Sequence, residues 1–249
     1  WGDIQWSNMS GAFSGCGNLT YNATEAPDLS ALDDLRHMFS DCSVFNATDL
    51  TNWDVSNVKE MSFMFSGATV FNGNITNWDV SNVISFKSMF GGTDNFNQDI
   101  SGWTINTNEP VDMQGMFSQS LLFNQPIGIW NVSKVTDMSY MFERASSFNQ
   151  PLDNWNVSNV IDMTQMFNLS EVNQNFGTWD ISNVNDMTDM FKNITLSREN
   201  YDATLIGWHT DTSGVASDGI DDVPSNITFS GGNSQYCTSA SAWNSLDTT

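Results

Sequence analysis

Basic side chains are scarce in this sequence of 249 residues, which has 7 lysines and arginines against 29 aspartates and glutamates. The resulting formal net charge of −22 repels phosphate backbones and anionic lipid headgroups. We therefore expect no nucleic-acid partner. Long hydrophobic runs are also missing, because no stretch approaches the roughly 20 apolar residues of a membrane-spanning helix. We accordingly expect no direct insertion into a membrane.

Residues and motifs of common catalytic sites are few as well. The two histidines, His37 and His209, lie far apart, and no Cys-x-x-Cys pair indicates structural zinc. The sequence also has no Gly-x-Ser-x-Gly elbow, no His-Glu-x-x-His zinc helix and no phosphate-binding glycine loop. We predict from these features that the protein is not an enzyme.

Aromatic residues and methionine, in contrast, are abundant, with 17 Phe, 13 Met and 10 Trp, and they recur at a fixed spacing. The dipeptide Met-Phe occurs seven times, and successive Phe residues of this series are 24 to 27 positions apart. The tryptophans in the same register are Trp53, Trp78, Trp103, Trp130, Trp155 and Trp179. Such self-similarity predicts an architecture of stacked repeats with an aromatic and methionine core.

Within one repeat, Val58, Met61, Met64, Phe65 and Ala68 follow the spacing of a helical stripe. The segment that follows them has the composition of a short strand after a turn. The sequence therefore predicts an α/β solenoid, in which each repeat consists of one short helix plus one short strand.

The repeats also suggest how the chain is organised. A single repeat cannot bury its apolar face alone, so we expect about eight stacked repeats over residues 1–192. The last apolar face of such a stack needs a cover, and we assign this role to a C-terminal capping region, residues 193–249. Because the chain opens inside a repeat, at Trp1, we expect further residues upstream.

One repeat in particular carries a resemblance to a known family. The stretch Trp53-Asp-Val-Ser-Asn-Val-Lys-Glu-Met-Ser-Phe-Met-Phe-Ser-Gly-Ala-Thr-Val-Phe-Asn resembles the repeat of BspA-like surface proteins, distant relatives of leucine-rich repeats. The resemblance covers residues 1–192 and extends to segments 196–208 and 227–237, which look like the family's ending. It implies a right-handed, leucine-rich-repeat-like stack, an extracellular location and no catalytic residues. Lys134, Val172 and the insertion 210–225 depart from the pattern.

From this resemblance and the composition we predict a secreted or cell-surface module for recognition or adhesion, which binds an extracellular protein or glycan through its repeat surface. A structural subunit that self-assembles into a surface filament or layer is the alternative. A polysaccharide-acting enzyme is a third and weaker reading, because a groove along the repeats could still hold paired carboxylates.

Polar residues that follow the repeated Phe-Asn pair are our preferred binding surface, because repeat proteins present such rows as an extended face. Alternatively, the Asn residues satisfy backbone groups at a turn and the Gln side chains are merely solvated. The candidate binding residues are Gln98, Asp99, Gln125, Gln150 and Gln174.

Two of the three cysteines, Cys16 and Cys42, occupy the same column in adjacent repeats. Neighbouring repeats bring Cα atoms about as close as a disulfide requires, and we predict this disulfide in an oxidising compartment. The alternative is two buried thiols in a column that holds Ala68 and Ala145 elsewhere. Cys237 is left over and is expected in the capping region.

An acidic stretch in the predicted capping region suggests calcium as a cofactor. Ca²⁺ prefers six to eight oxygen ligands, which clustered carboxylates and main-chain carbonyls around a glycine turn can supply. A solvated acidic loop is the alternative. The candidate ligands are Asp211, Asp218, Asp221 and Asp222.

The sequence contains ten Asn-x-Ser/Thr sequons, some of which arise from the repeat itself. A sequon is an acceptor for N-linked glycan only in a host that glycosylates secreted proteins. Our candidates for a glycoprotein form are Asn74, Asn168, Asn193 and Asn226.

Overall fold

The computed structural model describes residues 4–48, 50–209, 223–224 and 227–235. Regular secondary structure is sparse in this part of the chain. It consists of β1 (Val111–Asp112), the 3-10 helix η1 (Ile127–Ile129), β2 (Val135–Asp137) and α1 (Arg198–His209). The strands β1 and β2 pair in parallel, with a register shift between Val111 and Asp112. The fold is thus largely irregular and depends on contacts between residues far apart in the sequence.

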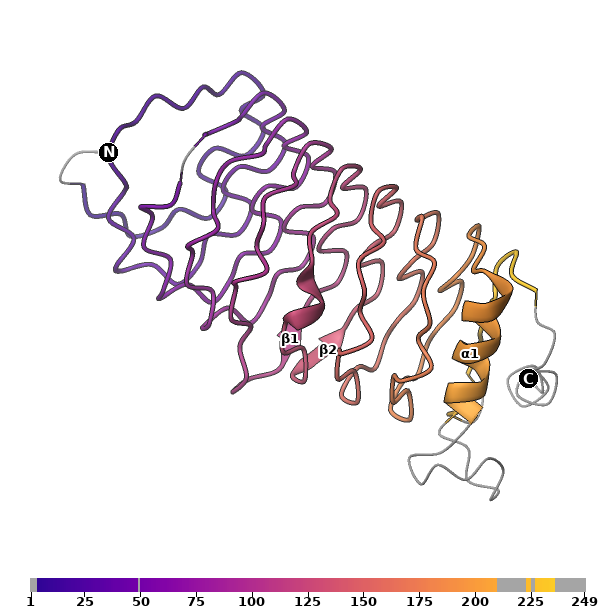
Figure 1. Cartoon of the computed structure of the whole chain (residues 1–249). Helices are drawn as coiled ribbons and strands as arrows, with labels where there is room; N and C mark the ends of the chain where they lie inside the picture. Colours follow the sequence, from indigo (N-terminus) through magenta and orange to yellow (C-terminus); the bar gives the residue numbers. More distant parts are fainter. Residues whose placement is uncertain (1–3, 49, 210–222, 225–226, 236–249) are drawn as a thin grey trace.

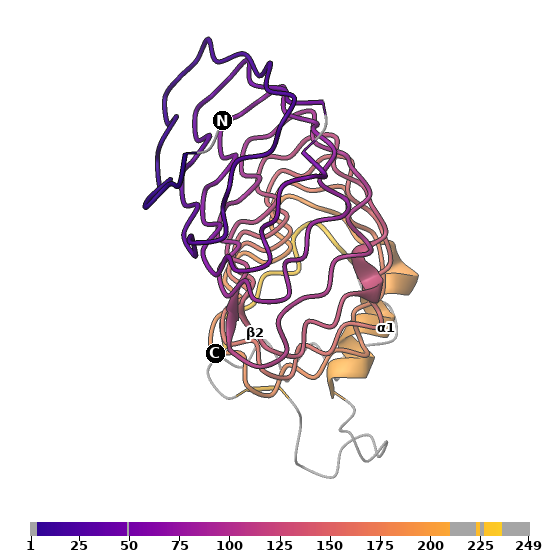
Figure 2. The same ribbon diagram turned by 90° about the vertical axis from the view of Figure 1, so that its left-hand side faces the viewer.

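The repeats follow one another along the length of the molecule, with the N-terminus at one end and α1 near the other (Figure 1). Viewed after a quarter turn, the successive loops of chain lie behind one another (Figure 2). Single parallel bridges, together with the β1–β2 pair, join each repeat to the next at one position, which we name the bridge column. Its members are Asp34, Glu60, Ser85, Asp112, Asp137, Asp162 and Asp186.

The predicted helix in each repeat is wrong. Around Met61, some backbone amides form tight turns, as when Met64 N–H donates to the carbonyl of Met61 at 3.1 Å. Others reach the next repeat, as when Phe65 N–H donates to the carbonyl of Met89 at 3.0 Å. Half of the amides are therefore used between repeats and are not available for helical bonds. A chain of four-residue turns buries the same apolar positions as a helical stripe would, which explains why the spacing was misleading.

Two left-handed positions in each repeat also exclude a helix. The residues two places before and two places after the repeated Phe have φ between 48° and 74°, a region that breaks a right-handed helix. We name the first set the outer column. Its members are Gly11, His37, Phe63, Ser88, Gly115, Tyr140, Gln165 and Asp189. The short strand predicted after Ala68 does not form either, since residues 70–78 are mostly irregular, with two turns and one bridge residue.

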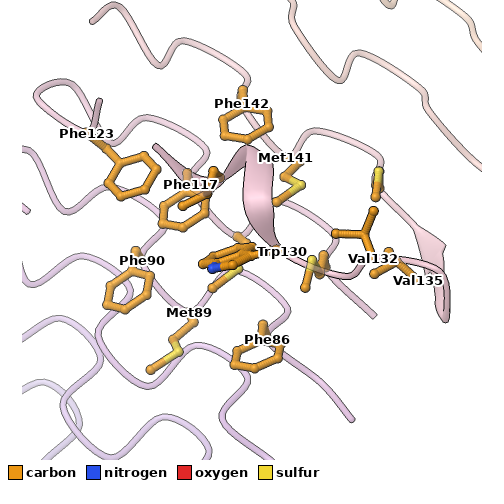
Figure 3. Close-up of a cluster of buried hydrophobic side chains, with 14 of the residues drawn as sticks. Phe86, Met89, Phe90, Phe117, Phe123, Trp130, Val132, Val135, Met141 and Phe142 are labelled. Carbon is orange, nitrogen blue, oxygen red and sulfur yellow. The ribbon is translucent and has the colours of Figure 1, made fainter. Parts of the chain in front are cut away.

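The core is a stack of aromatic rings that runs through the repeats. The ring of Phe117 lies 5.6 Å from that of Phe90 and 5.8 Å from that of Phe142, within 10° of parallel in both cases. Inside its own repeat, Phe117 stacks on Phe123 at 3.9 Å. Figure 3 shows these rings together with the methionines and Trp130 that pack around them. The prediction of an aromatic and methionine core is confirmed, because these side chains are fully buried.

The helix α1 continues the tryptophan column at the far end of the repeats. Trp208 stacks on Phe191 with centroids 6.3 Å apart, and its indole N–H donates to the carbonyl of Phe176 at 2.9 Å. The backbone of α1 is in contact with the backbone of the last repeat here, because a Cβ at Gly207 would overlap the carbonyl oxygen of Gly177. Residues 198–209 therefore cover the last repeat, whereas the boundary between repeats and capping region stays a prediction.

Candidate binding surfaces

The asparagines of the repeated Phe-Asn pair form a ladder of hydrogen bonds. Asn97 Oδ1 accepts the backbone N–H of Asn124 at 3.0 Å, and Asn124 Oδ1 accepts that of Asn149 at 3.1 Å. The ladder ends where Asn173 Oδ1 accepts the N–H of Ser197 at 2.7 Å, just before α1. The turn-satisfying role that we considered for these residues is confirmed.

The glutamines of the predicted binding surface are engaged in the same ladder. Gln98 Nε2 donates to both the carbonyl and Oδ1 of Asn72 at 3.0 Å, and Gln125 Nε2 does the same to Asn97 at 2.9 and 2.8 Å. Asp99 Oδ1 accepts the backbone N–H of Ser101 at 3.0 Å. The Ser101 hydroxyl and, to a smaller extent, this backbone bond lower the pKa of Asp99. The side-chain amide N–H groups of Gln98 and Gln125 are thus used in hydrogen bonds within the protein.

The remaining two glutamines behave in the same way. Gln150 Nε2 donates to Asn124 Oδ1 at 3.0 Å, and Gln174 Nε2 donates to the carbonyl of Gln150 at 2.9 Å. Gln174 Oε1 also accepts the N–H of Leu152 at 2.8 Å. These contacts give the row a structural role. A ligand would have to use the hydrogen-bonding groups that they leave over, among them the second N–H of Gln150 and of Gln174.

The predicted disulfide is not formed in this structure, where Cys16 and Cys42 are both free thiols. Cys42 is completely buried, and its Sγ donates to the carbonyl of Phe13 at 3.0 Å. Cys16, in contrast, is exposed. Burial raises the pKa of the Cys42 thiol, which keeps it protonated and weakly nucleophilic.

The calcium candidates Asp211, Asp218, Asp221 and Asp222 lie outside the described residues, and so does Cys237. Over residues 4–48, 50–209, 223–224 and 227–235, no three side chains among His, Cys, Asp and Glu gather as a metal site would require. Calcium binding therefore stays a prediction that rests on the sequence.

The sequon asparagines differ in accessibility. Asn193 is exposed and its Nδ2 donates to Asn168 Oδ1 at 3.1 Å. Asn168 is only 6% exposed, and its Nδ2 donates to Gln165 at 2.9 Å, so that a glycan there would need this buried amide to become accessible. Asn74 is half-buried, and its Oδ1 accepts from Thr76. Asn226 lies outside the described residues.

A surface that the sequence argument missed lies along the outer column. The neighbouring core positions hold Met or Phe in nearly every repeat, whereas the outer column changes its residue type from one repeat to the next. Outside the glycines its side chains are exposed or half-buried, and the rings of His37 and Phe63 stack in parallel at 4.7 Å. A variable column inside a constant repeat was visible in the sequence and could have indicated this surface.

The bridge column beside it carries negative charge. Asp112 sits in this column, where burial and, to a smaller extent, the charge of Asp137 raise the pKa of its carboxyl group. Asp186, at the other end, has a lowered pKa because the hydroxyl of Thr188 donates to it. Arg36 pairs with Asp34 at 2.7 Å and offsets one of these charges. The surface along the bridge and outer columns is therefore acidic and carries different side chains in each repeat.

These features define a repeat protein with a packed aromatic and methionine core and an outer column whose residue type changes from repeat to repeat. The chain matches the family described as "Mycoplasma protein of unknown function, DUF285" in two overlapping copies, over residues 7–111 and 104–204. The protein belongs to this family. No curated protein and no solved structure matches it. In the described part of the chain, no helix has the length and apolar character needed to cross a membrane.

Proposed function

We propose that this protein is a non-catalytic module for recognition or adhesion, secreted or held at a cell surface, that binds an extracellular protein or glycan. The observation that carries the proposal is the outer column, where side chains vary while inter-repeat hydrogen bonds hold them in a fixed register. Repeat proteins bind through such extended surfaces.

The finer description of the fold belongs to the same proposal. We infer a right-handed solenoid of the BspA-like kind, related to leucine-rich repeats, from the resemblance of the repeat around Trp53. The parallel bridges along the bridge column support this reading, since each joins residues about 25 positions apart. Turns take the place of the helices that the spacing of the apolar residues predicted.

The left-handed backbone of the outer column allows a sharp test. Glycine adopts positive φ without the steric cost of a Cβ, and the column already holds Gly11 and Gly115. Phe63→Gly and Tyr140→Gly therefore remove half-buried side chains and leave the backbone geometry intact. Asp41→Gly and Leu169→Gly, in the left-handed positions after the repeated Phe, are matched controls.

The experiment applies the labelled wild-type chain to arrays of glycans and of extracellular proteins, and then compares the four variants on the ligands that bind. We expect the outer-column variants to lose most of the binding and the controls to retain it. The urea midpoint of unfolding should be equal to or higher than that of the wild type in all four variants. Equal binding by all four variants would show that another face is used.

Self-association is a separate outcome that the same material can reveal. Light scattering over a concentration series, with and without calcium, measures the size of the particles. A monomer at all concentrations supports the recognition role. Growth into long particles would instead support a structural subunit, and a calcium requirement for that growth would direct attention to the Asp211–Asp222 segment.

A further inference from the structure

One repeat is lengthened by an inserted segment, residues 106–110, which directly precedes β1 and its register shift against β2. Register shifts of this kind bend a strand and often lie beside functional sites. A cavity of about 320 Å³ lies between the insertion and the two preceding repeats, and we name it the insertion pocket. Its lining residues are Lys59, Asn82, Ile84, Asn106, Asn108 and Glu109.

Asn106 is the central polar residue of this pocket and is only 4% exposed. Its Oδ1 accepts the backbone N–H groups of Asn108 at 2.8 Å and Glu109 at 3.1 Å, which shapes the inserted segment. The Nδ2 group has no hydrogen-bond partner within the described part of the chain. Among the described residues this nitrogen is not one of the fully buried polar atoms left without a partner, so it reaches solvent where Asn106 lines the pocket. An acceptor atom of a molecule bound there can therefore pair with it.

The other lining residues supply complementary groups. Asn82 Nδ2 donates to the carbonyl of Ser56 at 2.7 Å, which orients the amide and leaves its Oδ1 as an acceptor. Glu109 and Lys59 add a carboxylate and an ammonium group at the exposed rim, and Ile84 adds an apolar wall. Hydroxyl groups both donate and accept hydrogen bonds, so a polyhydroxylated molecule uses all of these groups at once.

The same groove three repeats further along shows what the insertion adds. There, a cavity of about 390 Å³ is lined by Asn159, Ile161, Ser182, Asn183 and Asn185, without an inserted segment. Asn159 and Asn183 each donate from Nδ2 to a backbone carbonyl of the preceding repeat, as Asn82 does. A counterpart of Asn106 and the two charged residues are absent from its lining. Of these two pockets, only the insertion pocket thus has an unpaired amide N–H from a nearly buried asparagine.

We propose that the insertion pocket binds one uncharged sugar residue of hexose size. The donor Asn106 Nδ2, the acceptors Asn82 Oδ1 and Glu109, and the wall of Ile84 recognise its hydroxyl groups and one apolar face. This site is separate from the outer column, and its ligand would be a monosaccharide or the terminal unit of a glycan.

Isothermal titration of the whole chain with a panel of neutral hexose and N-acetylhexosamine methyl glycosides tests the proposal. Asn106→Asp keeps the Oδ1 acceptor that shapes the segment but removes the N–H donor, and it should weaken binding about tenfold, the effect of about one hydrogen bond. Ile84→Trp fills the pocket and should abolish binding. Ile161→Trp is the matched control and should bind as the wild type does.

Circular dichroism and urea unfolding establish that each variant is folded before binding is compared. Absence of binding to every glycoside of the panel would overturn the proposal, and so would equal binding by the wild type and Ile84→Trp. Amino acids serve as a charged comparison, because Lys59 and Glu109 together could also hold a zwitterion, and preference for them would overturn the sugar assignment. The outer-column variant Tyr140→Gly should leave the titration unchanged, which separates this site from the proposed recognition surface.

Discussion

Trp130 donates its indole N–H to the backbone carbonyl of Ile100 at 3.1 Å, in the preceding repeat. The same carbonyl also accepts the backbone N–H of Trp103 at 3.0 Å, so both of its lone pairs are used. One side chain thus fills the core and joins the backbones of two repeats. This arrangement recurs at Trp78, Trp103, Trp155 and Trp179, and again at Trp208 in α1.

Trp130→Phe removes this hydrogen bond and leaves space where the larger indole was. We expect the free energy of unfolding to fall by about 2–4 kcal/mol, from the lost bond and the cavity together. Urea unfolding followed by circular dichroism measures the change. Ile129→Ala is the control, because Ile129 is 74% exposed and should alter stability little. An unchanged unfolding midpoint for Trp130→Phe would contradict the prediction.

The asparagine ladder gives a second prediction. Asn97 Oδ1 accepts from the backbone N–H of Asn124 and from Gln125 Nε2. Asn97→Ala therefore leaves the Asn124 N–H without this acceptor and leaves Gln125 Nε2 with the Asn97 carbonyl alone. We expect a loss of about 1–3 kcal/mol in unfolding free energy, measured by urea unfolding. Asn95→Ala changes an exposed side chain two positions away and should cost much less. Equal losses in the two variants would show that the ladder is not stabilising.

Two carboxyl groups of the bridge column should respond to pH with opposite signs. The raised pKa of Asp112 means that its charged form destabilises the fold above the ordinary value of 3.8. Asp112→Asn keeps an oxygen for the bond from Gln114 N–H. We expect this variant to be more stable than the wild type at pH 7, and the difference should vanish as the pH falls below 3.8.

Asp186 is the matched opposite case, because its lowered pKa means that the charged form stabilises the fold above its ordinary value of 3.8. Asp186→Asn should therefore be less stable than the wild type at pH 7, and this difference should disappear as the pH falls through the lowered pKa. Urea midpoints from pH 2 to pH 7 follow both variants. If the difference in urea midpoint between each variant and the wild type stays constant over this pH range, the two pKa directions are wrong.

The two described cysteines should differ in reactivity. Cys16 is exposed, whereas Cys42 is buried and its thiol donates a hydrogen bond to the carbonyl of Phe13. Burial also raises the pKa of the Cys42 thiol. In a Cys237→Ser background, iodoacetamide should label Cys16 rapidly and Cys42 only after unfolding, as mass spectrometry of the peptides would show. Resistance of both thiols without reductant, relieved by reductant, would instead demonstrate the disulfide predicted from the sequence.

The contact between α1 and the last repeat gives a final prediction. Gly207→Ala places a methyl group against the backbone of Gly177 and should cost about 1–3 kcal/mol through displacement of the helix. Gly102→Ala is the control, since a Cβ there has no neighbour within 4 Å. Thermal unfolding and limited proteolysis of α1 compare the two variants. Similar behaviour of both would show that α1 does not depend on this close approach.

The regular spacing of Trp, Met and Phe was sufficient to predict the repeats, their register and the composition of the core. These conclusions need only the alternation of apolar and polar positions, which a linear sequence contains in full. The sequence also suggested the turn role of the asparagine column. It could not show that the amide groups of Gln98 and Gln125 donate to the same ladder, because these bonds depend on which atoms of neighbouring repeats come into contact.

The backbone path of each repeat was decided by tertiary contacts. Met61, Met64 and Phe65 have the spacing of a helix, yet their amides alternate between local turns and carbonyls of the next repeat. Local propensity is weak compared with the hydrogen bonds that a stacked neighbour provides along the whole chain. The sequence by itself therefore determined what lies inside this protein, whereas the stacking of repeats determined its backbone conformation, its outer column and the pocket beneath the insertion.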